Sequence, residues 1–525
     1  MHSDLGEDLA HWFDLHHVPY TVRGSRLFVR RGERGLDVYR AAYERPLANS
    51  VAVAGLRVVD PHGVDAEVTR VAPLRVTFRG GAHLYVADER VVVELPEGFL
   101  LETGSVDESQ ANIEIVRGCE GTGIRALAAE LGEWMAKCPR VDKQWRDVTR
   151  FCWWVLGANT LRLDAPIGTN RAVVPSKIGY VGLWQWDAYF MAIGLRHGDV
   201  DLATEQLRIA LAHQGADGQL PDVVHDEGVL ASSEDLPPGD LENLRRMSSP
   251  SLANSRVPLT KPPLTALAVQ LLAEKAGSAV VDEFLPAMMA AQDWWYSTSA
   301  PSGRPAYLHP YSSGLDDSPI FDTEAILISP DLVSYLILAD HILAGWLRER
   351  GRESDAQRCS SRSDHAVADL VATWDARRGF FPSIGEQGTP VTSETIVSLM
   401  PLLVEGLPGE QMQAMLDALT DPQRFGTPHP LPTVAVRDPA FAPAEMWRGP
   451  VWVNTNWLVA KGLRARGATD LAERLEFATL RLVAQHGPNE YFRPDTGEKP
   501  PRATTVFGWS AALTVDLAVR LSTGN

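Results

Sequence analysis

The feature that most constrains the fold is a change of hydrophobic pattern near residue 143, after which apolar residues recur at helical spacing. No strands are predicted between the twelve candidate helices that follow. They span residues 143–159, 184–198, 201–214, 260–276, 279–298, 330–350, 354–375, 392–403, 408–420, 450–466, 468–485 and 507–522. Twelve helices suggest six hairpins, and their closed arrangement is an (α/α)6 barrel with an inner and an outer ring. A stacked helical solenoid is the competing arrangement, but the sequence shows no repeat of fixed period.

The first 118 residues have a different pattern. Short β-branched stretches alternate with polar residues and are separated by Gly, Pro and Asp turns, as in "SRLFVRR", "LRVTFRG" and "RVVVELP". We therefore expect a β-rich domain over residues 1–118, a helical linker over 119–142 and the barrel over 143–525. The predicted fold is mainly α, an (α/α)6 barrel with an N-terminal β-sandwich-like domain.

Charge and cysteine usage limit the partners and the location. The formal charge of −18 argues against nucleic acid or an anionic membrane, because binding phosphates needs a basic surface. The four cysteines include no CxxC pair and are interpreted as free thiols in a reducing compartment. The N-terminus does not resemble a secretory signal, and the longest apolar runs fall short of the ~20 residues that span a membrane. We expect a cytoplasmic protein, and a homo-oligomer is compatible with the sequence.

The segments between the candidate helices are uneven in length. Four of them are long and rich in Gly, Pro, Asp and aromatic residues, namely 215–259, 299–329, 421–449 and 486–506. Long and short segments tend to alternate, which predicts that one rim of the barrel carries the long ones. Long structured loops on a helical scaffold commonly carry function.

Carboxylates flanked by aromatic residues recur around this rim. They are Asp187 at a helix start, Asp316 and Asp317 behind a Ser-Ser-Gly bend, and Glu490 after an apolar helix. Singly, each has a structural interpretation: a favourable helix-dipole contact, a turn, or an acceptor for loop amides. Together they suit glycoside hydrolysis, in which a protonated carboxyl group serves the leaving oxygen and an ionised one activates water or attacks the sugar.

No motif for a cofactor accompanies these carboxylates. The sequence lacks a phosphate-cradling GxxxxGK[ST] loop, a GxGxxG after a strand, an HExxH zinc motif and a GxSxG elbow. The histidines, among them His197, His213, His225 and His309, are too scattered to propose a metal site. We therefore predict no metal and no cofactor, and a small-molecule α-glycoside as the partner.

Five segments, in order, resemble glycoside hydrolase family 63 over roughly residues 150–522. They read "WQWDAYF", "TKPPLTALA", "SGLDDSP", "WRGPVWVNTNWL" and "NEYFRPDTGE". The family includes bacterial glucosylglycerate and mannosylglycerate hydrolases and, more distantly, the trehalases. The resemblance implies an (α/α)6 barrel that hydrolyses an α-linked sugar with inversion at the anomeric carbon.

The resemblance also implies roles for the residues that match these segments. Asp316 matches the general acid and Glu490 the general base, while Asp317 is expected to turn away and brace its loop. Because inversion needs a water between base and sugar, the two carboxyl groups are expected to lie about 6.5–9.5 Å apart. Trp186 and Asp187 match a pair that holds sugar hydroxyls, and Trp447, Arg448 and Trp452 match the wall of the sugar pocket. The other predicted substrate-binding residues are Trp184, Tyr189, Tyr311, Gly314, Tyr491 and Trp509.

The leading interpretation is an exo-acting, inverting α-glycosidase, preferentially an α-glucosidase, acting on a small or terminally glucosylated substrate. Ser312 and Ala188 depart from the family near the sugar, so the substrate does not carry over. Two alternatives stay open: a sugar epimerase or isomerase on the same barrel, for which His309 is the nearest histidine, and a non-catalytic carbohydrate-binding protein. The N-terminal domain is expected to pack against the barrel and to wall the pocket, with direct sugar binding less favoured.

Overall fold

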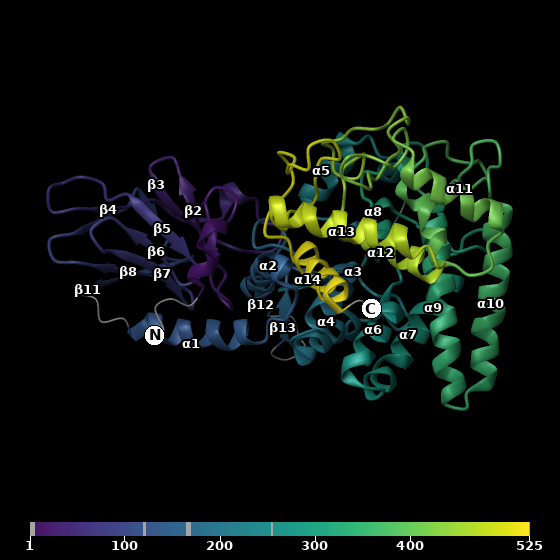
Figure 1. The fold of residues 1–525 in the computed structure, drawn as a ribbon, viewed down its shortest axis with the longest axis horizontal. Coiled ribbons are helices and arrows are strands. Elements are labelled where there is room, and N and C mark those ends of the chain that lie inside the picture. Colours follow the sequence, from purple (N-terminus) through teal and green to yellow (C-terminus); the bar gives the residue numbers. More distant parts are fainter. Residues whose placement is uncertain (1–5, 119–121, 164–169, 254–255, 524–525) are drawn as a thin grey trace.

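The computed structural model describes residues 6–118, 122–163, 170–253 and 256–523. Figure 1 shows a strand-rich N-terminal domain beside a large helical domain. The fold is an (α/α)6 barrel with a sheet-rich N-terminal domain, which confirms the predicted fold class. The domain boundaries at residues 118 and 142 stay predictions, and residues 119–121 of the predicted linker lie outside the described residues.

Two sheets form the N-terminal domain. One has the strand order β1-β2-β3-β4-β10, with β9 also paired to β4, and the other has the order β11-β8-β7-β6-β5. The strands are β1 (Tyr20–Thr21), β2 (Leu27–Gly32), β3 (Gly35–Arg40), β4 (Val51–Val59), β5 (Val68–Ala72), β6 (Arg75–Phe78), β7 (His83–Ala87), β8 (Arg90–Leu95), β9 (Leu100–Glu102), β10 (Ser105–Val106) and β11 (Asn112–Arg117). Apolar side chains from both sheets, including Val29 and Val38 of one and Val91 and Val93 of the other, share one core. The alternation seen in the sequence produces this core because successive side chains of a strand point to opposite faces.

Six helical segments form the closed inner ring of the barrel. Each contacts the next, and the last contacts the first, in the order α3 (Gln185–Leu195), α6 (Thr265–Ala276), α9 (Pro330–Glu349), η7 (Ile396–Leu403), α12 (Val453–Ala465) and α14 (Gly508–Thr523). One outer helix packs on each, in the same order: α4 (Val200–Ala212), α7 (Ala279–Ser297), α10 (Glu353–Ala372), α11 (Gly409–Thr420), α13 (Thr469–His486) and α2 (Arg146–Ala158). Every residue of the inner helix α3 is buried, whereas the outer helix α10 buries three. A helix that is apolar on all sides belongs inside, and an amphipathic one outside.

Three local predictions were wrong. The segment predicted as a helix over 392–403 forms a 3-10 helix over residues 396–403 only, and the ring of Pro401 disfavours an α-helical turn because it clashes with the carbonyl four residues earlier. The prediction of no strands between the helices is likewise wrong, because short strands lie between residues 160 and 385. The predicted loop over 215–259 contains a hairpin of β15 (Val223–His225) and β16 (Gly228–Leu230) and the helix α5 (Pro238–Arg246). Proline at the start of α5, an acidic first turn and a basic last turn all favour this helix.

The remaining helices and strands are short or connect these parts. They are α1 (Thr122–Ala136), β12 (Thr160–Leu163), β13 (Asn170–Val173), β14 (Leu183–Trp184), α8 (Pro310–Ser313), β17 (Leu327–Ile328), β18 (Ile384–Gly385) and the 3-10 turns η1 (Glu7–Trp12), η2 (Leu47–Asn49), η3 (Lys143–Trp145), η4 (Ser233–Asp235), η5 (Pro250–Ala253) and η6 (Pro319–Phe321). In the described part of the chain, no helix has the length and apolar character needed to cross a membrane.

The N-terminal domain packs directly against the barrel. Phe28 of β2 shares an apolar cluster with Leu161 and Val174 of the helical domain. Trp12 stacks on Phe151 of α2 with ring centroids 4.5 Å apart and planes 1° apart. These contacts hold the two domains together.

Candidate active site

A cavity of about 540 Å³ lies between the N-terminal domain and the long-loop rim of the barrel. The N-terminal domain contributes Tyr43 and Glu44 to its wall, helix α5 contributes Asp240, and barrel loops contribute Asp316 and Glu490. The N-terminal domain therefore walls the pocket, as expected. This volume falls within the range of small-molecule sites.

A smaller cavity of about 60 Å³ adjoins the first on the barrel side. The two cavities share Tyr180, Trp184, Lys261, Asp316, Met446 and Glu490. The rest of the small cavity is mostly aromatic, with Trp186, Trp447, Trp452, Phe507 and Trp509 in its wall. Both candidate catalytic carboxyl groups therefore lie where the aromatic cavity opens into the larger one.

A sharp turn at Gly314 brings Asp316 to this junction. The short helix α8 ends at Gly314, whose φ of 70° lies in the left-handed region that glycine adopts most readily. A Cβ on Gly314 would also collide with the indole ring of Trp186. Both the turn and the close approach of the tryptophan therefore require glycine.

The adjacent aspartates behind this turn face different surroundings. Asp316 Oδ1 is buried, accepts no hydrogen bond from a described residue and lies 4.0 Å from Lys261 Nζ. Burial raises the pKa of Asp316, and the Lys261 ammonium group opposes that rise. Asp317 Oδ1 accepts the backbone N–H of Trp447 at 2.7 Å, so this carboxylate ties two rim loops together. Asp316 thus presents a carboxyl oxygen without a described partner to the cavity, while Asp317 makes a structural contact.

Glu490 lies at the same junction with both carboxylate oxygens held by donors. The Tyr180 hydroxyl donates to Oε1 at 2.9 Å, and the Thr504 backbone N–H donates to Oε2 at 2.8 Å. Burial raises the pKa of Glu490 to about 7, the two hydrogen bonds oppose the rise, and the negative charge of Asp316 adds to it. A fixed carboxylate with a pKa near neutrality is suited to take a proton from water.

Lys261 lies at the centre of a buried group of carboxylates. Its ammonium group donates to the Tyr311 carbonyl at 2.6 Å and lies 3.1 Å from Asp222 Oδ1. Burial lowers the pKa of this lysine, but the charges of Asp222 and Asp316 outweigh burial and raise it. Burial raises the pKa of Asp222 to about 7 against the opposing charge of Lys261, and it also raises that of Asp187. The ammonium group of Lys261 therefore faces the carboxyl groups of Asp187, Asp222 and Asp316, whose charged forms burial disfavours.

Stacked indole rings form the wall of the small cavity. Trp447 lies on Trp452 with ring centroids 3.6 Å apart and planes 5° apart, and Trp509 meets Trp186 edge-on at 5.3 Å. The indole N–H groups of Trp447 and Trp509 are buried and donate to no described residue. Buried donors are nearly always satisfied, so these two are available to an acceptor that enters the cavity, a water or a bound molecule. Flat apolar faces beside such donors suit a sugar ring.

Most of the predicted binding residues lie on the cavity walls. The small cavity is lined by Trp184, Trp186, Asp187, Gly314, Trp447, Trp452 and Trp509, and the large one by Tyr311 and Tyr491. Their roles in binding stay predictions.

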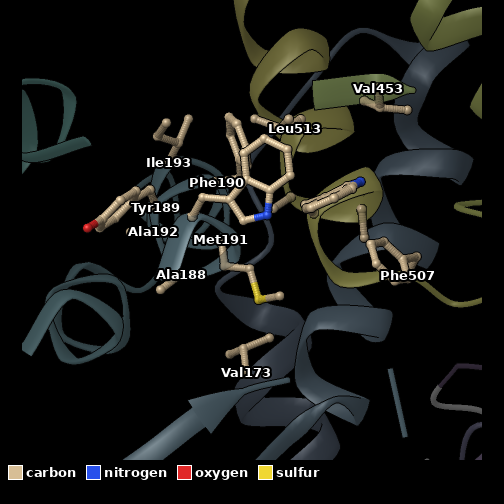
Figure 2. Close-up of a cluster of buried hydrophobic side chains, with 14 of the residues drawn as sticks. Val173, Ala188, Tyr189, Phe190, Met191, Ala192, Ile193, Val453, Phe507 and Leu513 are labelled. Carbon is tan, nitrogen blue, oxygen red and sulfur yellow. The ribbon is translucent and has the colours of Figure 1, made fainter. Parts of the chain in front are cut away.

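Tyr189 and Arg448, also predicted to bind substrate, line neither cavity. Tyr189 lies among the buried side chains of α3, and Gln185 and Thr265 donate to its hydroxyl oxygen (Figure 2). It lies there because α3 is buried on all sides, so the residues that follow the cavity-lining first turn face neighbouring helices. Arg448 donates to both carboxylate oxygens of Asp322, at 2.7 and 2.8 Å, which holds its guanidinium group away from the cavity.

His309 does not serve the alternative chemistry that would need a histidine acid or base. Its ring is 1% exposed and lies outside both cavities, and its Nδ1 accepts the backbone N–H of Tyr311 at the start of α8. Burial lowers the pKa of His309 to about 3. The imidazole is a neutral helix cap.

The lining residues that were missed in the sequence include Tyr43, Glu44, Tyr180, Asp222, Asp240 and Lys261. Lys261 had a usable signal, since a lysine stands in the apolar "TKPPLTALA" segment just before a helix. Tyr43 and Glu44 belong to another domain and to no motif. Among the residues that the structure describes, no group of three or more His, Cys, Asp or Glu side chains is arranged to hold a metal ion.

Comparisons with known proteins agree with this geometry. Residues 180–510 match a family model described as the mannosylglycerate hydrolase MGH1-like glycoside hydrolase domain. A mannosylglycerate hydrolase of Thermus thermophilus is 28% identical over 409 residues, which cover 65% of this chain and 95% of that protein. A glucosylglycerate hydrolase of Mycolicibacterium hassiacum is 26% identical over 429 residues, covering 67% and 94%.

Solved structures show the same likeness. The crystal structure of a GH63 mannosylglycerate hydrolase from Thermus thermophilus in complex with glucose has a TM-score of 0.58 and 26% identity, covering 70% of this chain and 98% of that one. Neutral trehalase Nth1 from Saccharomyces cerevisiae, at 16% identity and a TM-score of 0.52, covers 79% and 82% and shares the fold. The hydrolase relatives are matched over nearly their whole length, whereas about a third of this chain has no counterpart in them.

Proposed function

The chain belongs to the MGH1-like glycoside hydrolases, and from this membership we propose that it is an exo-acting, inverting α-glycosidase that removes a terminal sugar from a small glycoside. The observation that carries the proposal is the position of Asp316 and Glu490 at the junction of two cavities. The aromatic cavity holds the terminal sugar, and the larger one receives the leaving group. Glucose is the favoured sugar and mannose the second; relatives named as glucosylglycerate and mannosylglycerate hydrolases support both sugars.

Asp316 acts as the general acid in this proposal. Its buried Oδ1 accepts no hydrogen bond from the described residues, so the proton that burial favours can be given to the glycosidic oxygen. Lys261 Nζ, 4.0 Å away, then stabilises the carboxylate that proton transfer leaves behind. The indole N–H groups of Trp447 and Trp509 donate to hydroxyl groups of the sugar.

Glu490 acts as the general base. Hydrogen bonds from Tyr180 and Thr504 fix its carboxylate, which takes a proton from the water that attacks the anomeric carbon. The attack comes from the face opposite the leaving group, so the configuration inverts. An α-glycoside therefore yields the β-anomer first.

A proton NMR time course tests this stereochemistry. The purified protein is incubated with trehalose, kojibiose, nigerose, isomaltose, glucosylglycerate and mannosylglycerate, and the first anomer released is identified. We expect the β-anomer, with the α-anomer growing only by mutarotation. An α-anomer at the earliest time points would overturn the role of Glu490 as a base, because a retaining enzyme uses that carboxylate as a nucleophile.

The pH profile of kcat/KM should report the ionisation of Glu490. With a pKa near 7, this base is protonated below neutrality, so the rate is expected to fall about tenfold per pH unit on the acid side. Replacing Tyr180 by Phe removes a hydrogen bond that lowers this pKa, and the acid limb should move to higher pH. Values of kcat/KM measured from pH 4 to 9 for the wild type and Tyr180→Phe check this. An acid limb that lies below pH 5 in the wild type and does not move in Tyr180→Phe would contradict it.

We also propose that the enzyme is cytoplasmic. Cys138, Cys152 and Cys359 are free in the structure, and the last two are buried. Free thiols favour a reducing compartment. Assembly into a homo-oligomer stays a prediction.

A further inference from the structure

The loop after strand β3 fixes two N-terminal residues at the large cavity. The Tyr43 ring stacks on the imidazole of His225 in the β15–β16 hairpin, with centroids 4.0 Å apart and planes 4° apart, and lies 6.1 Å from the Trp184 ring. Glu44 follows with a φ of 50°, a backbone conformation that residues other than glycine adopt rarely. A Cβ added to Gly239 of helix α5 would lie 3.7 Å from Glu44 Oε2. The loop is therefore held between the hairpin and α5, with its carboxylate at the cavity.

Carboxyl groups gather on one side of this cavity, next to Asp316. Glu44, Asp222 and Asp240 all line it, and the charge of Asp316 acts on Asp222 and Asp240. In the described part of the chain, the carboxylates of Glu44 and Asp240 have no hydrogen bond and no ion pair. Asp222 is 2% exposed and pairs with Lys261 Nζ, 3.1 Å from its Oδ1. Glu44 and Asp240 are half-buried, so their unpartnered carboxyl groups are open to donors on a bound molecule.

The cationic residues of the cavity wall lie toward other groups. Lys499 Nζ donates to the carbonyls of Pro500 and Ala503, Arg30 donates to the carbonyl of His16, and Arg502 lies 3.7 Å from Glu445. Arg246 also lines the cavity, and its charge acts on Asp317. On the acid side, Lys261 is engaged by Asp222 and the Tyr311 carbonyl, so Glu44 and Asp240 are the carboxyl groups open to a ligand. In an inverting hydrolase the leaving group lies on the side of the general acid. The carboxylates therefore flank the leaving group.

We propose that Tyr43, Glu44 and Asp240 form a leaving-group subsite for a neutral, hydroxyl-rich group, a sugar or a polyol. This inference rests on the proposed function and adds the class of leaving group. Carboxyl groups accept hydrogen bonds from hydroxyl groups, and a protonated carboxyl group can also donate one. Burial and the nearby charges of Glu44, Asp316 and Asp222 already raise the pKa of Asp240 to about 8. An anionic leaving group such as glycerate would add another negative charge to this acidic site, which the site disfavours. Two of the three residues lie outside the segment matched by the family model, residues 180–510.

Steady-state kinetics of the full-length protein test the subsite. The wild type, Glu44→Gln and Asp240→Asn are compared on trehalose, kojibiose, nigerose and isomaltose, on glucosylglycerate and mannosylglycerate, and on the α-fluorides of glucose and mannose. Fluoride is too small to reach Glu44, so the fluorides report the sugar cavity and the catalytic pair alone. Glu97→Gln is the matched control, since Glu97 is an exposed glutamate of the same domain outside the cavity.

We expect the best disaccharide to exceed both glycerates in kcat/KM by at least about tenfold in the wild type. Glu44→Gln and Asp240→Asn should each lower kcat/KM for that disaccharide at least about tenfold more than for the fluoride. Glu97→Gln should match the wild type.

Three results would overturn the inference while the proposed function stands. The first is that the wild type hydrolyses the fluorides and prefers a glycerate to every disaccharide. The second is a preference for a glycoside with an amino sugar as leaving group, when one is added to the panel. The third is that the Glu44 and Asp240 substitutions lower kcat/KM equally for the disaccharide and the fluoride. Hydrolysis of none of these glycosides or fluorides would overturn the proposed function itself, and the subsite with it.

Discussion

Glu490→Gln is expected to lower kcat/KM about 100- to 10,000-fold on every substrate of the wild type, including glycosyl fluorides. The amide cannot take a proton from water, and no second carboxylate shares the hydrogen bonds from Tyr180 and Thr504. Asp316→Asn should cause a similar loss on disaccharides but a much smaller one on fluorides. Fluoride leaves without a proton, so an enzyme without its general acid still hydrolyses that bond.

Steady-state rates on one disaccharide and one fluoride, measured for both variants, separate the two roles. Full activity of Glu490→Gln would remove it as the base, and equal losses of Asp316→Asn on both substrates would remove Asp316 as the acid. Thermal unfolding supplies the control for folding. Asp316 Oδ1 has no hydrogen-bond partner among the described residues and its charged form is disfavoured by burial, so Asp316→Asn should melt at or above the wild-type temperature.

Lys261→Met is expected to destabilise the protein by about 3–5 kcal/mol at pH 8, the usual cost of removing one partner from a buried charge cluster. Lys261 is 4% exposed, and its ammonium group compensates Asp222 and Asp316, which methionine leaves facing each other. Without Lys261 the pKa values of these carboxyl groups rise further above their unfolded values. The folded variant then binds more protons than the unfolded chain, so its stability falls as the pH rises from about 4 through the folded pKa values. The loss should therefore be larger at pH 8 than at pH 5.

Urea unfolding of the wild type and Lys261→Met at both pH values measures this difference. Lys177→Met is the matched control, because Lys177 is equally buried but donates to Thr21 Oγ1 and the Val22 carbonyl, both at 2.9 Å. Burial lowers the pKa of Lys177 to about 7, so much of its charge is already absent at pH 8. We expect about 1–3 kcal/mol for this variant. Equal losses for the two variants, or a Lys261→Met loss that does not shrink at pH 5, would contradict the charge cluster.

The sequence was informative where local pattern determines structure. Helical periodicity predicted the segments of both rings, because a helix must turn one apolar face to its neighbours. It could not identify the 3-10 geometry of residues 396–403, where a single proline changes the hydrogen bonding inside an otherwise regular apolar stretch. It also missed α5, whose short amphipathic pattern is hidden in a long polar segment.

The candidate site was predictable where it lies in motifs and unpredictable where it depends on packing between domains. Asp316, Glu490 and the tryptophans of the small cavity come from segments that resemble a known family. Glu44 reaches the cavity only because the β-rich domain packs against the barrel. The hydrophobic pattern of the sequence does not predict how two domains pack against each other. Tyr189 was assigned to the site because of its place beside Asp187, but successive residues of a helix face different directions.

Closure of the inner ring by α14 against α3 has a consequence for biosynthesis. During translation, α3 leaves the ribosome long before α14, so the inner surface of α3 waits for a partner that is made last. Trp186 of α3 meets Trp509 of α14 edge-on, and both are buried only after that late contact. The β-rich domain can fold while the ribosome is still working, because domains fold as units from the N-terminus. A nascent chain arrested before α14 would thus display a folded first domain, an open apolar ring that attracts chaperones, and no catalytic pocket.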